Sequence, residues 1–126
     1  MKKINIKSPI IPMVSIGDIM LGEHIDDYIL SFKKDIFIID GNNYETQYGI
    51  LNIPIYIYVT NDCGLIHKLS AFHGYEGKYK EYLSVGMSVS SILTEDTEFY
   101  YDDFYEGLLD KSKTILLEFS DNIPWD

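Results

Sequence analysis

Apolar residues follow two different periods along this chain. They recur at helical spacing in two short stretches, at Ile25, Tyr28, Ile29 and Phe32 in the first and at Val89, Ile92 and Leu93 in the second. Residues three or four positions apart share one face of a helix, so each stretch predicts a short amphipathic helix. We expect Ser88 to cap the second helix, and Glu23 or Asp26 to interact with the positive end of the first helix dipole.

Strand-like segments follow each predicted helix. The pattern predicts strands at 35–40, 44–51, 53–60 and 65–72 after the first helix, and at 98–103, 104–109 and 113–120 after the second. Turn-forming residues separate several of them, most clearly at 41–43 and 61–64. Short connections between such elements favour an α+β fold, in which an antiparallel sheet carries short helices on one face. In the strand at 53–60, apolar side chains occupy both faces, so we expect both faces to need at least partial cover.

A weak internal repeat is also visible, at an offset of about seventy residues. The segment Val14–Ile19 can be laid over Leu83–Ser88, because in both an apolar residue and a glycine precede a predicted helix. The chain would then be one domain, 1–126, with possible repeats at 14–72 and 82–126. Chance similarity between two helix and strand segments is the alternative explanation.

Length and composition fit one soluble domain. The chain has 126 residues, 46% of them hydrophobic, which suffices for a real core. The lone Cys63 excludes an internal disulfide and favours a reducing compartment, so we expect a cytoplasmic protein. The apolar run Pro9–Val14 is too short to span a membrane.

Negative charge is concentrated at the end of the chain. Ten carboxylates and two lysines lie between Glu95 and Asp126, which gives this segment −8 of the net charge of −10. Aromatic and aliphatic residues are threaded through it, so we expect a folded acidic surface and not a disordered tail. Such a surface attracts a basic partner and repels nucleic acid. The residues expected to bind a partner are Glu98, Tyr101, Asp102, Asp103, Tyr105, Glu106 and Asp110. The alternative is that these acids only keep a small protein soluble.

No motif for chemistry is present. The soft metal ligands, Cys63 and the histidines at 24, 67 and 73, match no zinc spacing. Cys63 with His67 or His73 supplies residue types for a thiol nucleophile, but without a supporting pattern. No glycine-rich phosphate loop occurs. The segment 72–82 mixes tyrosines with lysines and reads as an ordered loop that contacts protein. We therefore expect no enzyme, no metal, no cofactor, and no binding of nucleic acid or membrane.

Short motifs before the two helices carry a family resemblance. Leu21-Gly22, Val85-Gly86-Met87-Ser88-Val89 and the ending Ile123-Pro124-Trp125-Asp126, in an acidic domain of this length, resemble bacterial immunity proteins of polymorphic toxin systems, including contact-dependent growth inhibition. The Gly-Met-Ser element is also similar to the tandem helix-plus-sheet modules of beta-lactamase-inhibitor-like proteins.

The resemblance implies a toxin inhibitor of the cytoplasm, paired with one cognate toxin. The toxin would be a basic nuclease, and inhibition would follow from covering its active site or substrate groove. Two other classes remain open at this point. One is a DNA mimic that blocks a DNA-binding enzyme, and the other is a small enzyme that uses Cys63 and His67.

Overall fold

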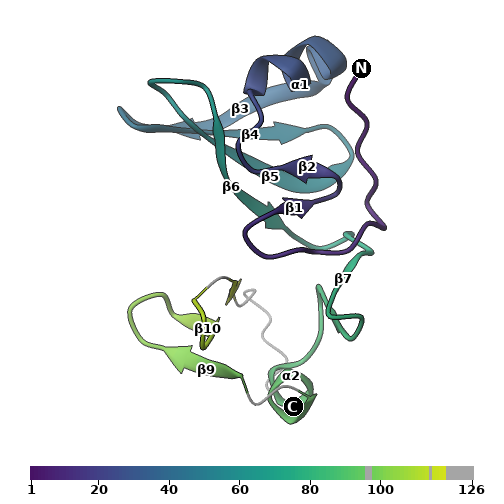
Figure 1. Cartoon of the computed structure of the whole chain (residues 1–126), viewed down its shortest axis with the longest axis vertical. Coiled ribbons are helices and arrows are strands. Elements are labelled where there is room, and N and C mark those ends of the chain that lie inside the picture. The colour runs from purple at the N-terminus through teal and green to yellow at the C-terminus, as the bar shows by residue number, and fades with distance from the viewer. Residues whose placement is uncertain (96–97, 114, 119–126) are drawn as a thin grey trace.

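Two units follow each other along the chain, and each contains a short β-hairpin, a helix and an antiparallel sheet (Figure 1). The computed structural model describes residues 1–95, 98–113 and 115–118. The first unit contains β1 (Ser15–Ile16), β2 (Ile19–Met20), α1 (Ile25–Phe32), the 3-10 turn η1 (Lys33–Asp35), β3 (Ile36–Gly41), β4 (Glu45–Ile50), β5 (Ile53–Thr60) and β6 (Ile66–Ala71). The second contains β7 (Lys78–Tyr79), β8 (Leu83–Ser84), α2 (Val89–Glu95), β9 (Phe99–Asp102), β10 (Gly107–Asp110) and β11 (Leu116–Glu118).

The α+β class with antiparallel strands is confirmed, but the strands form several small sheets where one was expected. The orders are β1-β2, β3-β4-β5-β6, β7-β8 and β11-β10-β9. The chain leaves the four-stranded sheet after β6 because the amides of Glu76 and Gly77 both donate to the carbonyl of Ile6, at 2.9 and 3.0 Å. These bonds tie the connection to the N-terminal segment, so the second unit builds its own sheet.

The four-stranded sheet follows directly from the alternation in β5. Ile55, Ile57 and Val59 are buried and pack in one cluster with Ile25 and Tyr28 of α1. The strand has the predicted bounds, 53–60, because its alternation is strong and a turn follows at once. The opposite face carries half-buried tyrosines, one of which, Tyr56, stacks on Phe72 with ring centroids 4.4 Å apart.

The helix ends show which capping predictions hold. The hydroxyl of Ser88 accepts a hydrogen bond from the amide of Ser91 at 3.2 Å, so its capping role is confirmed. In α1, His24 caps the helix by accepting from the amide of Asp26, and Asp26 lies in the first turn, where its charge suits the helix dipole. Glu23 lies outside the first turn of the helix.

Glu23 is the centre of a polar network beside α1. Its carboxylate forms an ion pair with Lys2 and accepts from the hydroxyl of Tyr28 at 2.6 Å and the amide of Met20 at 2.7 Å. Burial works to raise the pKa of Glu23, but the hydrogen bonds from Lys2, Tyr28 and Met20 outweigh it and lower the pKa. The network fixes the N-terminus against the helix.

The two units show the same order of elements when β2 is matched to β8. Ile19–Ile25 then corresponds to Leu83–Val89, which differs by five residues from the alignment based on sequence. Gly22 and Gly86 fall on equivalent positions and both have left-handed backbones, with φ of +93° and +96°. A glycine favours this conformation because it has no Cβ, so both units enter their helix through the same kind of bend.

The second unit has its own small core. Val89 and Ile92 of α2 pack with Phe99 and Leu108 of the three-stranded sheet. The prediction of a strand at 104–109 was wrong in its first half, because residues 103–106 form the turn between β9 and β10. The amide of Ile10 donates to the carbonyl of Lys78 at 2.9 Å, which links the N-terminal segment to this unit.

Candidate functional site

The turn between β9 and β10 gathers most of the residues that the sequence marked as partner-binding. The side chain of Asp102 accepts a hydrogen bond from the amide of Tyr105 at 3.0 Å, which is a local device that holds a turn closed. Glu106 has a positive φ of 53°. Gly107 follows, and a Cβ there would lie 2.5 Å from the carbonyl oxygen of Leu117. The turn is therefore fixed by its own sequence and by the close passage of β11.

Two aromatic rings stand exposed at the tip of this turn. Phe104 is 85% exposed and Tyr105 is 54% exposed. Their rings are edge to face, with centroids 4.9 Å apart, which is a favourable geometry for an aromatic pair. A phenylalanine so exposed buries almost no apolar area in the folded chain. Its place among charged residues is typical of an anchor that a protein partner buries.

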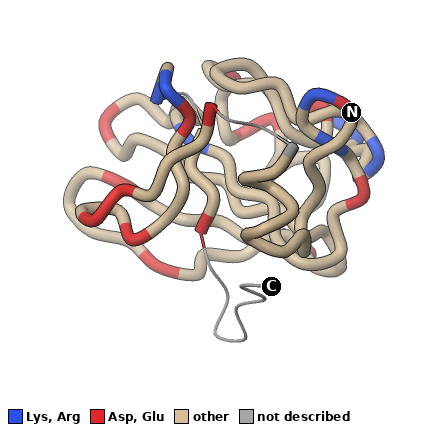
Figure 2. Tube along the Cα trace, turned by 90° about the horizontal axis from the view of Figure 1, so that it is seen from below, with Lys and Arg blue, Asp and Glu red and all other residues tan. Residues whose placement is uncertain are grey.

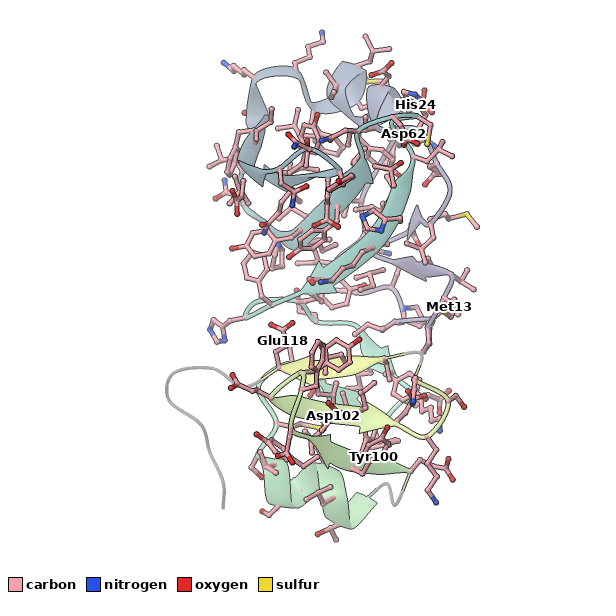
Figure 3. All side chains as sticks on the ribbon, turned by 90° about the vertical axis from the view of Figure 1, so that its left-hand side faces the viewer. Met13, His24, Asp62, Tyr100, Asp102 and Glu118 are labelled. Atoms are coloured by element: carbon pink, nitrogen blue, oxygen red, sulfur yellow. The ribbon has the colours of Figure 1, made fainter. Side chains whose placement is uncertain are left out.

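Carboxylates flank the aromatic pair along the chain. Asp103 and Glu106 are exposed beside it, and Asp102 is half-buried. The strand register adds Glu118. Asp102 of β9 and Glu118 of β11 are both register partners of Gly107 in the middle strand β10, so their side chains lie on the same face of the sheet. Figure 3 shows Tyr100, Asp102 and Glu118 on the same side of the sheet. We call this surface the acidic face and define it by Tyr100, residues 102–106 and Glu118.

The charge of the acidic face is not balanced locally. Residues 98–118 contain six carboxylates and two lysines, a net charge of −4. Both lysines, Lys111 and Lys113, lie beyond the far end of β10, about 13 Å from the turn at the usual rise of a strand. None of the ion pairs observed among residues 1–95, 98–113 and 115–118 involves a carboxylate of the acidic face. Figure 2 shows acidic positions on many loops and lysines in a few separate places, one beside the N-terminus.

Three of the predicted partner residues lie elsewhere on the hairpin. Glu98 precedes β9 and Asp110 ends β10, so both lie at the end of the hairpin away from the turn. Asp110 is only 6% exposed, and its carboxylate accepts from the amide of Ile115 at 3.1 Å. Tyr101 shares a sheet face with Leu108, its register partner, which packs toward α2. Asp110 thus stabilises the next turn and is not part of the acidic face.

Three members of the acidic face, Tyr100, Phe104 and Glu118, were missed from the sequence. Tyr100 belongs to it because its side chain lies on the same side of the sheet as that of Asp102. Phe104 was assigned to a strand, although Asp102-Asp103 before it and Gly107 after it are turn-forming residues. Glu118 joins the face only through the pairing of β10 with β11. That pairing depends on tertiary structure, and no local signal in the sequence gives it.

The residues considered for thiol chemistry have separate neighbours. The sulfur of Cys63 lies 3.0 Å from the hydroxyl of Thr60 in the turn after β5. His67 on β6 points its Nε2 at a carboxylate oxygen of Glu45, 2.6 Å away. Within the described part of the chain, no three His, Cys, Asp or Glu side chains are grouped so that they could hold a metal ion.

Comparison with known proteins adds no relative: no family model, no curated protein and no solved structure matches the chain. Neither helix in the described residues has the length and apolar character needed to cross a membrane. The geometry of the acidic face is therefore the main evidence on function.

Proposed function

We propose that this protein is an immunity protein that binds and neutralises a cognate basic toxin through its acidic face. The observation that carries the proposal is the exposed Phe104 and Tyr105 pair, flanked along the chain by the carboxylates of Asp102, Asp103 and Glu106. A central aromatic anchor with a charged rim is the usual composition of a protein-binding surface. The sign of the rim selects a partner rich in arginine and lysine.

The aromatic rings also suit a basic partner chemically. An arginine guanidinium can stack on the face of Tyr105 or Phe104 while it donates hydrogen bonds to a neighbouring carboxylate. Both interactions strengthen when the partner excludes water. Carboxylates placed in this way would occupy positions that substrate phosphates take in the groove of a basic nuclease.

The same arrangement supports a protein inhibitor over a mimic of DNA. A DNA mimic needs negative groups repeated over a long face with a spacing close to that of duplex phosphates. On this hairpin the carboxylates are few and enclose an aromatic pair, and Asp110 is withdrawn into the interior. The proposal assigns no catalytic residue to the chain.

The test uses the basic C-terminal domain of a secreted toxin encoded beside this protein. We expect one-to-one binding and complete loss of toxin activity. Phe104→Ala should weaken binding by about 2 kcal/mol or more, roughly thirtyfold, because the ring would be the buried anchor. The matched control is Tyr44→Ala, since Tyr44 is 82% exposed and belongs to the first unit.

Two results would contradict the proposal. One is that the toxin domain does not bind at low salt, where attraction between opposite charges is greatest. The other is that Phe104→Ala and Tyr44→Ala weaken binding equally. The thermal unfolding midpoint of each variant, measured in parallel, separates loss of contact from loss of fold.

A further inference from the structure

The edge strand β3 exposes a row of apolar side chains. It is the outermost strand of the order β3-β4-β5-β6, as Figure 1 shows. Phe37, Ile38 and Ile39 are 48%, 64% and 43% exposed. An edge strand with three successive exposed apolar residues is a template for pairing with another strand, because its outer backbone groups are also unpaired within the sheet.

The other edge of the same sheet is protected. The amide of Gly22 donates to the carbonyl of Ile66 at 2.8 Å, and the amide of Ile66 donates to the carbonyl of Glu23 at 2.9 Å. These bonds cover the start of β6 with the segment that leads into α1. Among the described residues, the outer side of β3 has no such neighbouring strand. The contrast makes β3 the open edge of the sheet.

The backbone bonds of β3 indicate which of its groups point outward. The amide of Leu51 donates to the carbonyl of Asp35 at 2.8 Å, and Phe37 pairs with Gly49 two positions further along. Bonding direction alternates along an antiparallel pair, so residues 35 and 37 bond to β4. The amide and carbonyl groups of Ile36 and Ile38 then point away from the sheet and are available to another strand.

We propose that β3 pairs with β3 of a second copy of this chain, antiparallel and about a two-fold axis at Phe37. In this register, Ile36 lies opposite Ile38 of the second copy, so the outward groups of one strand meet those of the other. Phe37 faces its own counterpart in a pair without direct backbone bonds, where side chains approach most closely. The two sheets would join into one continuous sheet.

Charge at the ends of the strand favours an antiparallel pair. Lys34 lies just before β3 and Asp40 lies near its end, and both are exposed. Lys34 belongs to η1, which leads into β3, and β3 has a bulge between Ile38 and Asp40. Antiparallel pairing about Phe37 therefore brings the end of the strand that follows Lys34 in each copy beside the end that carries Asp40 in the other. The two ends carry opposite charges and attract each other across the pair.

A second copy fits this edge better than a basic partner does. Residues 1–41 contain five lysines and six carboxylates, a net charge of −1, so this region offers little attraction to a basic protein and little repulsion to another copy. A two-fold dimer also closes on itself, because it uses both open β3 edges and leaves none for further growth. The acidic face lies in the second unit and is not used.

Sedimentation equilibrium of the full chain tests the proposal. Because one pair of short strands buries little surface, we expect a weak dimer, with a dissociation constant of about 10 to 100 µM. Ile38→Lys should weaken it at least about tenfold, since a charge on an edge strand opposes pairing. Leu30→Lys is the matched control, because Leu30 is 70% exposed on α1 and the change in charge is the same.

A charge exchange tests the antiparallel orientation. Lys34→Asp and Asp40→Lys should each weaken the dimer about threefold or more, and the double variant should restore it, since the attractive pairs are rebuilt with reversed signs. A chain that stays monomeric at millimolar concentration would overturn the proposal. Three other results would also overturn it. One is that Ile38→Lys and Leu30→Lys weaken the dimer equally. The others are that the double variant does not recover the affinity of the wild-type dimer, and that assemblies larger than a dimer form. Toxin binding by the acidic face is measured in a separate experiment, so failure of one proposal would leave the other intact.

Discussion

Removing the hydroxyl of Tyr75 is the sharpest test of how the first unit is held together. This hydroxyl accepts from the amide of Gly17 at 2.9 Å and donates to the carbonyl of Ser8 at 2.5 Å. It therefore joins three segments that are far apart in sequence. Tyr75 itself is buried, with 4% of its surface exposed, so water has little access to these bonds.

The expected cost of Tyr75→Phe follows from the two groups left behind. A buried donor or acceptor that loses its partner costs about 1 to 3 kcal/mol. Two such groups, at Gly17 and Ser8, give roughly 2 to 6 kcal/mol for the variant. This is a large part of the about 5 to 15 kcal/mol that is usual for the stability of a whole domain. The thermal midpoint should fall by about 10 °C or more.

Urea unfolding of the wild type and two variants measures this cost. The control is Tyr44→Phe, which removes a hydroxyl from a side chain that is 82% exposed and should change the free energy of unfolding by less than about 0.5 kcal/mol. If Tyr75→Phe also changes it by less than about 0.5 kcal/mol, the hydroxyl does not satisfy the two backbone groups and the reasoning fails.

Three further predictions concern stability. Gly22→Ala and Gly86→Ala should each lower the free energy of denaturant unfolding by about 1 kcal/mol, because an alanine strains a left-handed backbone. The cost should stay this small because a Cβ at either position meets no atom within 4 Å. Strongly unequal costs would contradict the equivalence of the two helix entries. Asp110→Ala should destabilise the protein by about 1 to 3 kcal/mol, since it leaves the amide of Ile115 without its acceptor, and a neutral result would show that the bond contributes nothing. Burial raises the pKa of Tyr28 and Tyr75, so in alkali both hydroxyls stay protonated in the folded state while they ionise in the unfolded state. The free energy of unfolding should therefore be unaffected by these groups below about pH 10 and should fall above it. Unfolding curves at alkaline pH that coincide with those at neutral pH would refute this prediction.

The sequence was informative where periodicity and turn chemistry agreed. The strand at 53–60 was predicted with its observed bounds, because alternation over eight residues is followed by Asn61-Asp62-Cys63-Gly64. Both helices were also expected from the spacing of their apolar residues. These signals are local, so they can be recognised without knowledge of the tertiary structure.

The two small hairpins were missed for a physical reason. Strands of two residues are too short to show a period of two. In β1 and β2, the turn at Gly17 and Asp18 has left-handed φ at both positions, 63° and 68°, and a glycine there was an available signal. In β7 and β8, the left-handed residues are Lys80 and Glu81, which carry no such signal.

The candidate site was predictable in charge but not in shape. The acidic segment and its aromatic residues were evident from composition, and four of the expected residues, Asp102, Asp103, Tyr105 and Glu106, do meet in one turn. Burial of Asp110 could not be foreseen, because it depends on the fold of the next turn. The exposure of Phe104 could not be foreseen either, since a phenylalanine is ordinarily counted with the core.

The salt dependence of toxin binding is the decisive measurement of where the toxin binds. Calorimetric titration of the basic toxin domain at several salt concentrations should compare the wild type with the double variant Asp103→Lys and Glu106→Lys. Asp102 is left unchanged, because its carboxylate closes the turn. Asp62→Lys is the control, since Asp62 is exposed and lies at the far end of the molecule from Asp102 in Figure 3.

We predict tight binding by the wild type that weakens steeply as salt is raised, because exposed charges are screened. The double variant should bind at least about a hundredfold more weakly at low salt and should show a much flatter dependence, while the control keeps most of the affinity. Equal affinity and equal salt dependence for the wild type and the double variant would contradict the claim that the acidic face is where the toxin binds.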